Sequence, residues 1–129
     1  MIVDTSAMAA ILFKEPEEDS FIQAIHDTAI CRISAANYVE LHIVVAAQWG
    51  EAASRQCDNF LHRSKIIIEP VTVEQALIAR QAYADFGKGR HAAGLNYGDC
   101  FAYALAMSMG EPLLFKGKDF SQTDIPSAK

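Results

Sequence analysis

Four carboxylates occupy positions from which they could act together on one substrate. They are Asp4, Glu40, Asp99 and Asp119. Two carboxylates about 4 Å apart repel by roughly 4 kcal/mol at an effective dielectric near 20, so a cluster would protonate or spread unless a cation joined it. Oxygen ligands without Cys or His favour a hard ion such as Mg²⁺ or Mn²⁺ over zinc. Such an ion keeps positions open for phosphate oxygens, as metal-assisted phosphodiester hydrolysis requires.

Short apolar runs alternate with helical patterns along the whole chain. Strands are predicted at 1–3, 29–34, 66–68 and 113–115, the third in a fully buried style. Helices are predicted at 7–13, 16–28, 35–49, 52–63, 72–86 and 96–109. This alternation implies parallel pairing and a three-layer α/β/α sandwich around a central parallel sheet of four to five short strands.

That fold gathers the acids at one edge, because ligands of open parallel sheets bind beyond the carboxyl ends of the strands. Asp4 follows the first strand, Asp119 follows the fourth, and Asp99 begins the helix that leads to the fourth. Glu40 lies on the 35–49 helix, where three- and four-residue spacing puts it on an apolar face. It shares that face with Ala36, Ile43, Val44 and Ala47. A carboxylate in such surroundings needs a partner.

Each acid also has an ordinary structural explanation. Asn96 is typical of a helix N-cap, and Asp99 three positions later fits a capping-box variant. Asp4 alone could be a turn residue and Asp119 a loop residue, whereas Glu40 is the hardest to explain as structure. The glycine-rich segment 87–94 is predicted to be a mobile loop.

Composition restricts the class of protein. The 129 residues hold 11 Lys+Arg against 16 Asp+Glu, a formal net charge of −5, and 51% are hydrophobic, which indicates one domain over residues 1–129. Disordered, collagen-like, disulfide-scaffold and membrane-spanning proteins are excluded, and the N-terminus lacks the basic region of a signal peptide. Cys31, Cys57 and Cys100 form no metal or redox motif, so we expect buried thiols and a cytoplasmic location.

Four segments together resemble the PIN-domain ribonucleases, specifically the VapC-type toxins of bacterial toxin–antitoxin pairs. They are MIVDTS at 1–6, SAANYVE at 34–40, LNYGDCFAYALA at 95–106 and PLLFKGKDF at 112–120. The resemblance covers essentially the whole chain, in order and at family spacing.

This resemblance implies an Mg²⁺- or Mn²⁺-dependent endoribonuclease that cuts cellular RNA, commonly tRNA or ribosomal RNA. It maps the metal-binding acids onto Asp4, Glu40 and Asp99, with Asp119 as the fourth, more variable member. Asp124 competes for that fourth position, and Asp119 ranks first because it precedes Phe120.

Three further features follow from the same resemblance. Thr5 or Ser6 matches a hydroxyl residue that often supports the site. The family also implies a homodimer and a VapB-type antitoxin whose C-terminal segment crosses the active-site groove. An Arg of that segment could pair with the carboxylates in place of the metal. Two helices would offer it apolar contacts, one through Phe21, Ile22 and Ile25 and the other through Phe60 and Leu61.

Three other classes of protein are alternatives. A receiver-type signalling domain needs an Asp after the third strand, where this chain has Glu69-Pro70. A haloacid-dehalogenase-like phosphatase would have a second Asp at the position of Ser6. The remaining alternative is a catalytically silent PIN-like binding module, against which the four intact acids argue.

The net charge of −5 does not indicate RNA binding, since nucleic-acid-binding proteins usually show a basic face. Four basic residues nevertheless lie in the two loops expected to surround the site, either as RNA contacts or as solvated loop charges. They are Lys88, Arg90, Lys116 and Lys118.

Overall fold

Four short strands form a central parallel sheet in the computed structural model, which describes residues 1–129. They are β1 (Ile2–Val3), β2 (Arg32–Ser34), β3 (Ile67–Glu69) and β4 (Leu113–Leu114). Their order is β3-β2-β1-β4, with β1 pairing with both β2 and β4 and every pair parallel. The predicted parallel sheet is therefore confirmed, although each strand is short.

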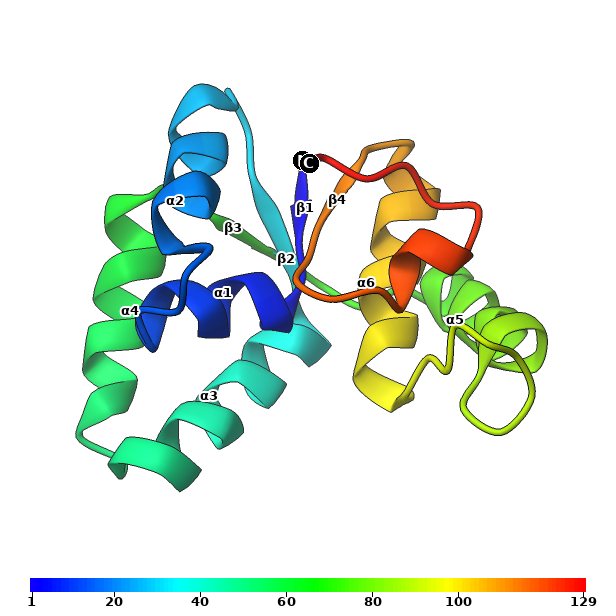
Figure 1. Cartoon of the computed structure of the whole chain (residues 1–129), viewed down its shortest axis with the longest axis horizontal. Helices are drawn as coiled ribbons and strands as arrows, with labels where there is room; N and C mark the ends of the chain where they lie inside the picture. The colour runs from blue at the N-terminus through cyan, green and yellow to red at the C-terminus, as the bar shows by residue number, and fades with distance from the viewer.

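Helices cover both faces of this sheet (Figure 1). They are α1 (Thr5–Leu12), α2 (Glu18–Asp27), α3 (Ala35–Trp49), α4 (Ala53–Arg63), α5 (Val73–Phe86) and α6 (Tyr97–Met109), followed by a 3₁₀ turn at Phe120–Gln122. The first four lie on one side, and α5, α6 and the C-terminal segment lie on the other. Each side has its own apolar cluster, so the predicted three-layer sandwich is confirmed.

Side-chain caps fix where three helices begin. Ser34 accepts a hydrogen bond from the backbone N–H of Ala36, and Thr72 accepts one from Gln75. Asn96 accepts from the N–H of Asp99 at 2.9 Å and completes the predicted capping box. Each cap satisfies a backbone donor that the first helical turn leaves unpaired. The positions of α3, α5 and α6 therefore follow from local chemistry.

The third strand is not fully buried, which corrects the prediction. Ile67 and Ile68 are 45% and 44% exposed, although both are aliphatic. The reason is the strand order, because β3 pairs only with β2 and forms the edge of the sheet. An apolar run alone does not distinguish a central strand from an edge strand.

The glycine-rich segment predicted as a mobile loop is closed at its base. Lys88 donates its N–H to the carbonyl of Leu95, and Leu95 donates to Phe86, each at 2.9 Å. Leu95 and Ala93 are buried in the apolar cluster between α5 and α6. Between Lys88 and Leu95, residues 89–92 are exposed.

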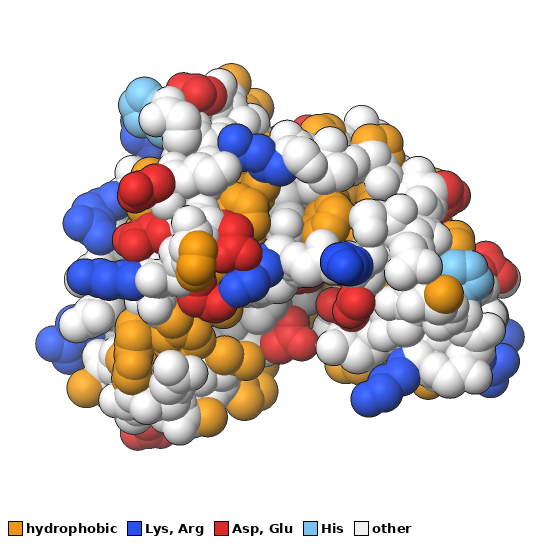
Figure 2. Space-filling model, viewed as in Figure 1, with side chains coloured by type: hydrophobic (Ala, Val, Ile, Leu, Met, Phe, Trp, Pro, Cys, Tyr) orange, Lys and Arg blue, Asp and Glu red, His pale blue; other side chains and the backbone are white.

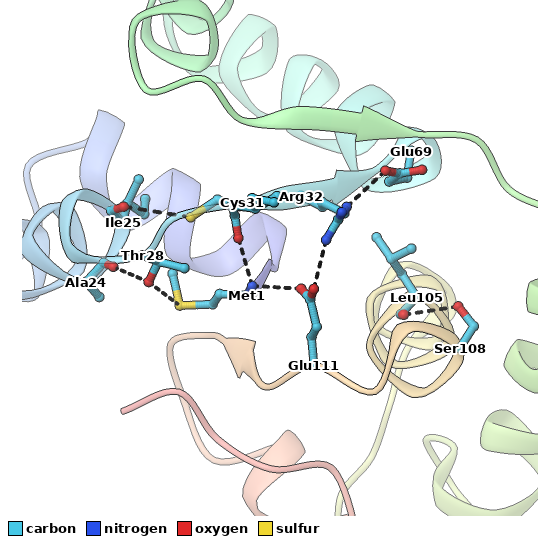
Figure 3. Close-up of polar contacts among 11 residues, drawn as sticks. Met1, Ala24, Ile25, Thr28, Cys31, Arg32, Glu69, Leu105, Ser108 and Glu111 are labelled. Carbon is cyan, nitrogen blue, oxygen red and sulfur yellow. Dashed lines mark hydrogen bonds and ion pairs between the residues drawn. The ribbon is translucent and has the colours of Figure 1, made fainter.

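An ionic network links Met1, which precedes β1, and the first residue of β2 to the last residue of β3 and to Glu111, which precedes β4 (Figure 3). Arg32 of β2 donates from Nε to Glu69 at 3.1 Å and from Nη1 to Glu111 at 2.8 Å. The amino group of Met1 also donates to Glu111, at 2.7 Å. These contacts hold the pKa of Glu111 below its usual range. Arg32 therefore ties β2 to β3 and to the residue that leads into β4.

The three cysteines are buried and free, as expected. Measured against the thickness of a bilayer, each helix is too short or too polar to span it.

Candidate active site

Asp4 lies at the carboxyl end of β1 and forms the N-cap of α1. Its Oδ2 accepts a hydrogen bond from the N–H of Ser6 at 2.9 Å, and the residue is 2% exposed. Its Oδ1 is buried and has no hydrogen-bond partner. A buried carboxylate oxygen without a donor is unfavourable, so this oxygen is available to a cation.

Glu40 receives its hydrogen bonds from neutral side chains. Thr5 donates its hydroxyl to Oε1, and Asn37 donates Nδ2 to the same oxygen at 3.3 Å. The buried face of α3 consists of Asn37, Leu41 and Val45. The apolar face on which Glu40 was placed is therefore not the core face, since Ile43 is exposed, and Glu40 lies half-buried beside it.

Asn37 and Gly98 bring α3 against the first turn of α6. Asn37 donates from Nδ2 to the carbonyl of Gly98 at 2.9 Å. A Cβ placed on Gly98 would lie 2.0 Å from Oε2 of Glu40, so the carboxylate occupies space that only glycine leaves free. The sequence marks neither residue as part of a site, although Asn37 lies three positions before Glu40.

Asp99 projects from the same turn of α6 and is half-buried. Its Oδ2 accepts from the N–H of Asn96 at 3.0 Å. Burial raises the pKa of Asp99 to about 6, and the charges of Asp119 and Glu40 act in the same direction. Burial likewise raises the pKa of Asp4 to about 7, with contributions from Asp99 and Glu40. The site therefore brings together acids that disfavour one another's ionisation.

Asp119 and Asp124 lie in different environments. Asp119 is exposed, directly before the 3₁₀ turn, and its charge acts on Asp99. Asp124 accepts a hydrogen bond from the hydroxyl of Tyr103 at 2.6 Å. Of the two candidates for the fourth acid, the structure groups Asp119 with the others.

Ser6 anchors the loop after β4 to the site. Its hydroxyl accepts the backbone N–H of Lys116 at 2.9 Å. The ammonium of Lys116 pairs with Glu15 and lies 3.5 Å from Glu17. Lys116 therefore holds the loop before α2 and is not a free cation for RNA. Lys88, Arg90 and Lys118 are exposed.

The carboxylates suit a hydrated divalent ion better than a closed cage of protein ligands. No three His, Cys, Asp or Glu side chains lie close enough together to coordinate one ion directly. Mg²⁺ usually keeps several waters and takes one or two carboxylates. The unpartnered Oδ1 of Asp4 and the all-oxygen donor set fit that preference. A hollow separates the half of the molecule built from α1 to α4 from the half built on α5 and α6, and acidic side chains lie along it (Figure 2).

Comparison with known proteins identifies the family. The family model described as the PIN domain matches residues 1–126. The chain is 49% identical over 125 residues to the VapC ribonuclease Mb0640 of Mycobacterium bovis, covering 97% of this chain and 95% of that relative. The chain belongs to the VapC ribonucleases of the PIN-domain family. The predicted resemblance is confirmed.

Two solved structures share the fold of this VapC family member. Mycobacterium tuberculosis VapC20, described as a sarcin-ricin loop cleaving toxin, superposes with a TM-score of 0.78 at 16% identity, covering 96% of this chain and 95% of that chain. VapBC2 of Rickettsia felis, bound to a DNA fragment from its promoter, gives 0.74 at 13% identity, covering 98% and 94%. Both confirm the PIN-like sandwich.

Proposed function

We propose that the protein is a divalent-metal-dependent endoribonuclease that acts as the toxin of a toxin–antitoxin pair. The observation that carries the metal dependence is the buried, unpartnered Oδ1 of Asp4, placed where the charges of Asp99 and Glu40 also act. The proposed substrate is cellular RNA, either tRNA or ribosomal RNA. The proposed location is the cytoplasm, which suits three free buried thiols.

Asp4 and Asp99 would hold the ion, with Glu40 and Asp119 completing its surroundings. Bound Mg²⁺ or Mn²⁺ supplies Lewis acidity toward a phosphate oxygen and lowers the pKa of a water. The chain's own residues set the geometry: Thr5 and Asn37 hold Glu40, and the Ser6 N–H fixes Oδ2 of Asp4. One of these carboxylates can accept a proton from the attacking water.

Proton release on metal binding tests this site without reference to activity. Because the pKa of Asp4 lies at about 7 and that of Asp99 at about 6, a bound cation should expel protons near neutral pH. Calorimetry of Mg²⁺ and Mn²⁺ binding in two buffers of different ionisation enthalpy measures that release. Asp4→Asn should remove most of it, whereas Asp124→Asn, at the acid bonded to Tyr103, should leave it unchanged.

Cleavage of a labelled RNA tests the reaction itself. Asp99→Asn and Glu40→Gln should each lower kcat at least a hundredfold while retaining a cooperative melt, and Asp124→Asn should cleave at the parental rate. A parent chain that binds Mn²⁺ but cuts neither tRNA nor ribosomal RNA would support the catalytically silent binding module instead. Cleavage that persists in EDTA would contradict metal dependence.

A cavity of about 560 Å³ between α1, α2 and α4 suits a VapB-type antitoxin segment. Ile22 and Phe60, two of the five residues expected to grip the antitoxin, line it. The other three, Phe21, Ile25 and Leu61, are buried in the core instead. We propose that an antitoxin tail places apolar side chains here and an Arg at the carboxylates.

A synthetic tail peptide distinguishes the two contacts. Loss of inhibition on changing its Arg to Ala, together with relief of inhibition by added Mg²⁺, supports competition at the carboxylates. Ile22→Lys should weaken peptide binding at any Mg²⁺ concentration. Inhibition that ignores the peptide's Arg and Mg²⁺ alike would place the block elsewhere.

We also propose that the toxin is a homodimer. Large apolar side chains are exposed on α3 and α5, among them Ile43, Val73 and Leu77, and exposed apolar surface is typical of protein interfaces. Sedimentation velocity should give a dimer for the parent chain and a monomer for Leu77→Lys. A parental chain that stays monomeric at high concentration contradicts this proposal.

A further inference from the structure

A second concave site lies beside the carboxylates, between α5 and the first turns of α6. It encloses about 540 Å³, within the range of roughly 300–1,000 Å³ that is common for small-ligand sites. Asn96 lines it and also exchanges two hydrogen bonds with Asp99. One residue of the cavity wall is therefore hydrogen-bonded directly to Asp99, a candidate metal ligand.

Aromatic rings dominate the wall. Tyr83, Tyr97 and Phe101 line the cavity, together with small side chains such as Ala76 and Ala79. Tyr97 is 78% exposed, and its ring meets Phe101 edge-to-face with centroids 4.9 Å apart. A large ring that is exposed yet held by a neighbour offers a flat, pre-ordered surface for stacking.

Cations without acidic partners surround these rings. Arg80 and Lys88 line the cavity, and the guanidinium of Arg90 lies 5.8 Å from the centroid of the Tyr83 ring. None of the three forms an ion pair, whereas Arg32 and Lys116 are both paired. In a chain of net charge −5, this local positive charge favours an anionic ligand.

We propose that this cavity binds one unstacked nucleotide of the RNA, beside the phosphodiester that is cut. The base stacks on Tyr97 or Tyr83, and Arg80 and Lys88 contact the flanking phosphates. Stacking platforms combined with cations are how proteins hold single-stranded nucleic acid. This inference rests on the proposed ribonuclease function and adds to it a site that favours an unpaired position in the RNA.

A second copy of the chain is the competing occupant, because Leu77 is exposed one turn from Arg80. Charge argues against it. A copy of this chain spreads its net charge of −5 over 129 residues that include 11 Lys and Arg of their own, whereas every nucleotide brings one phosphate next to one flat ring. The nucleotide therefore matches both features of the cavity.

Binding without cleavage tests the site directly. The probe is a fluorescein-labelled single-stranded decaribonucleotide in EDTA, followed by anisotropy with the parent chain, Tyr97→Ala, Tyr97→Trp and Arg80→Ala. Tyr97→Ala should raise Kd by about tenfold, and Tyr97→Trp should restore binding. Arg80→Ala should reduce the slope of log K against log salt concentration by about 0.7, as expected when one phosphate is no longer neutralised. The matched control, Arg55→Ala on the exposed face of α4, should leave both quantities unchanged.

Cleavage and sedimentation separate the remaining outcomes. With RNA as substrate, Tyr97→Ala should raise KM with little change in kcat. An unchanged Kd and KM in Tyr97→Ala, while Asp99→Asn abolishes cleavage, would overturn the nucleotide site and leave the ribonuclease function standing. A change in sedimentation with no change in Kd would assign the cavity to contact between copies, which also overturns the proposal.

Discussion

Asp4→Asn should make the metal-free protein more stable at neutral pH, although it removes a residue proposed to be essential. The substitution keeps the shape of the side chain and a carbonyl oxygen that accepts the N–H of Ser6. Asn also caps helices as well as Asp does, so α1 should be retained. What the variant loses is a buried negative charge whose Oδ1 has no partner.

The magnitude follows from the pKa of Asp4, which burial raises from its ordinary value of 3.8 to about 7. A carboxyl with a raised pKa binds its proton more tightly in the folded state. Stability is therefore lost as pH rises from the unfolded pKa through the folded pKa. For these two pKa values, the free energy of unfolding falls by roughly 2–3 kcal/mol between pH 5 and pH 8. The full loss, from a pH well below 3.8 to one well above 7, is roughly 4 kcal/mol.

Urea unfolding in EDTA at pH 5, 6, 7 and 8 measures this dependence. The parent chain should lose stability across the series, and Asp4→Asn should lose much less, so the gap between them widens with pH. Saturating Mg²⁺ should stabilise the parent at pH 8 and have little effect on the variant, because a ligand stabilises only the state that binds it.

Asp85→Asn is the matched control, since Asp85 is exposed and its contact is the amide of Gln81. Its effect should stay within about 0.5 kcal/mol at every pH. Parallel pH profiles for the parent and Asp4→Asn would refute the reasoning, because they would mean that Asp4 carries its charge in the folded site without penalty.

Three further substitutions separate residues that support the site from one that supports the sheet. Gly98→Ala should displace the Glu40 carboxylate, because its Cβ would lie 2.0 Å from Oε2. The loss of the hydrogen bonds from Thr5 and Asn37 should offset the roughly 1 kcal/mol by which Ala favours a helix, and kcat should fall at least tenfold, as thermal melts and initial rates will show. Asn37→Ala should cost about 1–3 kcal/mol in urea unfolding, since it removes donors to Glu40 and to the Gly98 carbonyl; an unchanged melt would contradict this account. Arg32→Met should also cost about 1–3 kcal/mol by leaving Glu111 with fewer donors, while kcat measured on labelled RNA stays at the parental value.

The fold was predictable from the sequence wherever local chemistry determines it. Apolar runs, the capping residue Asn96 and the alternation of elements suffice for a parallel sheet between layers of helices. The exposure of β3 was not predictable, because Ile67 and Ile68 are as apolar as a central strand. Strand order results from the packing of the whole chain, and no local pattern encodes it.

The candidate site divides in the same way. Asp4 and Asp99 could be placed because strand ends and helix starts mark them, and Asp119 could be placed next to them by topology. The partners of Glu40 could not, since Thr5 is 35 residues away from it in the sequence. The absence of a Cβ at Gly98 has meaning only once α3 and α6 lie together. Likewise, the pairing of Lys116 with Glu15 depends on two loops that meet only in the folded chain.

The carboxylates also lie across a seam between the two halves of the molecule. Asp4 and Glu40 belong to the half built from α1 to α4, and Asp99 belongs to the half built on α5 and α6 (Figure 1). The buried hydrogen bond from Asn37 to the carbonyl of Gly98 joins the halves at this point. Their separation therefore sets the distance between Asp4 and Asp99. Loosening the seam should weaken metal binding without removing any ligand, because electrostatic attraction to the ion falls as the carboxylates move apart.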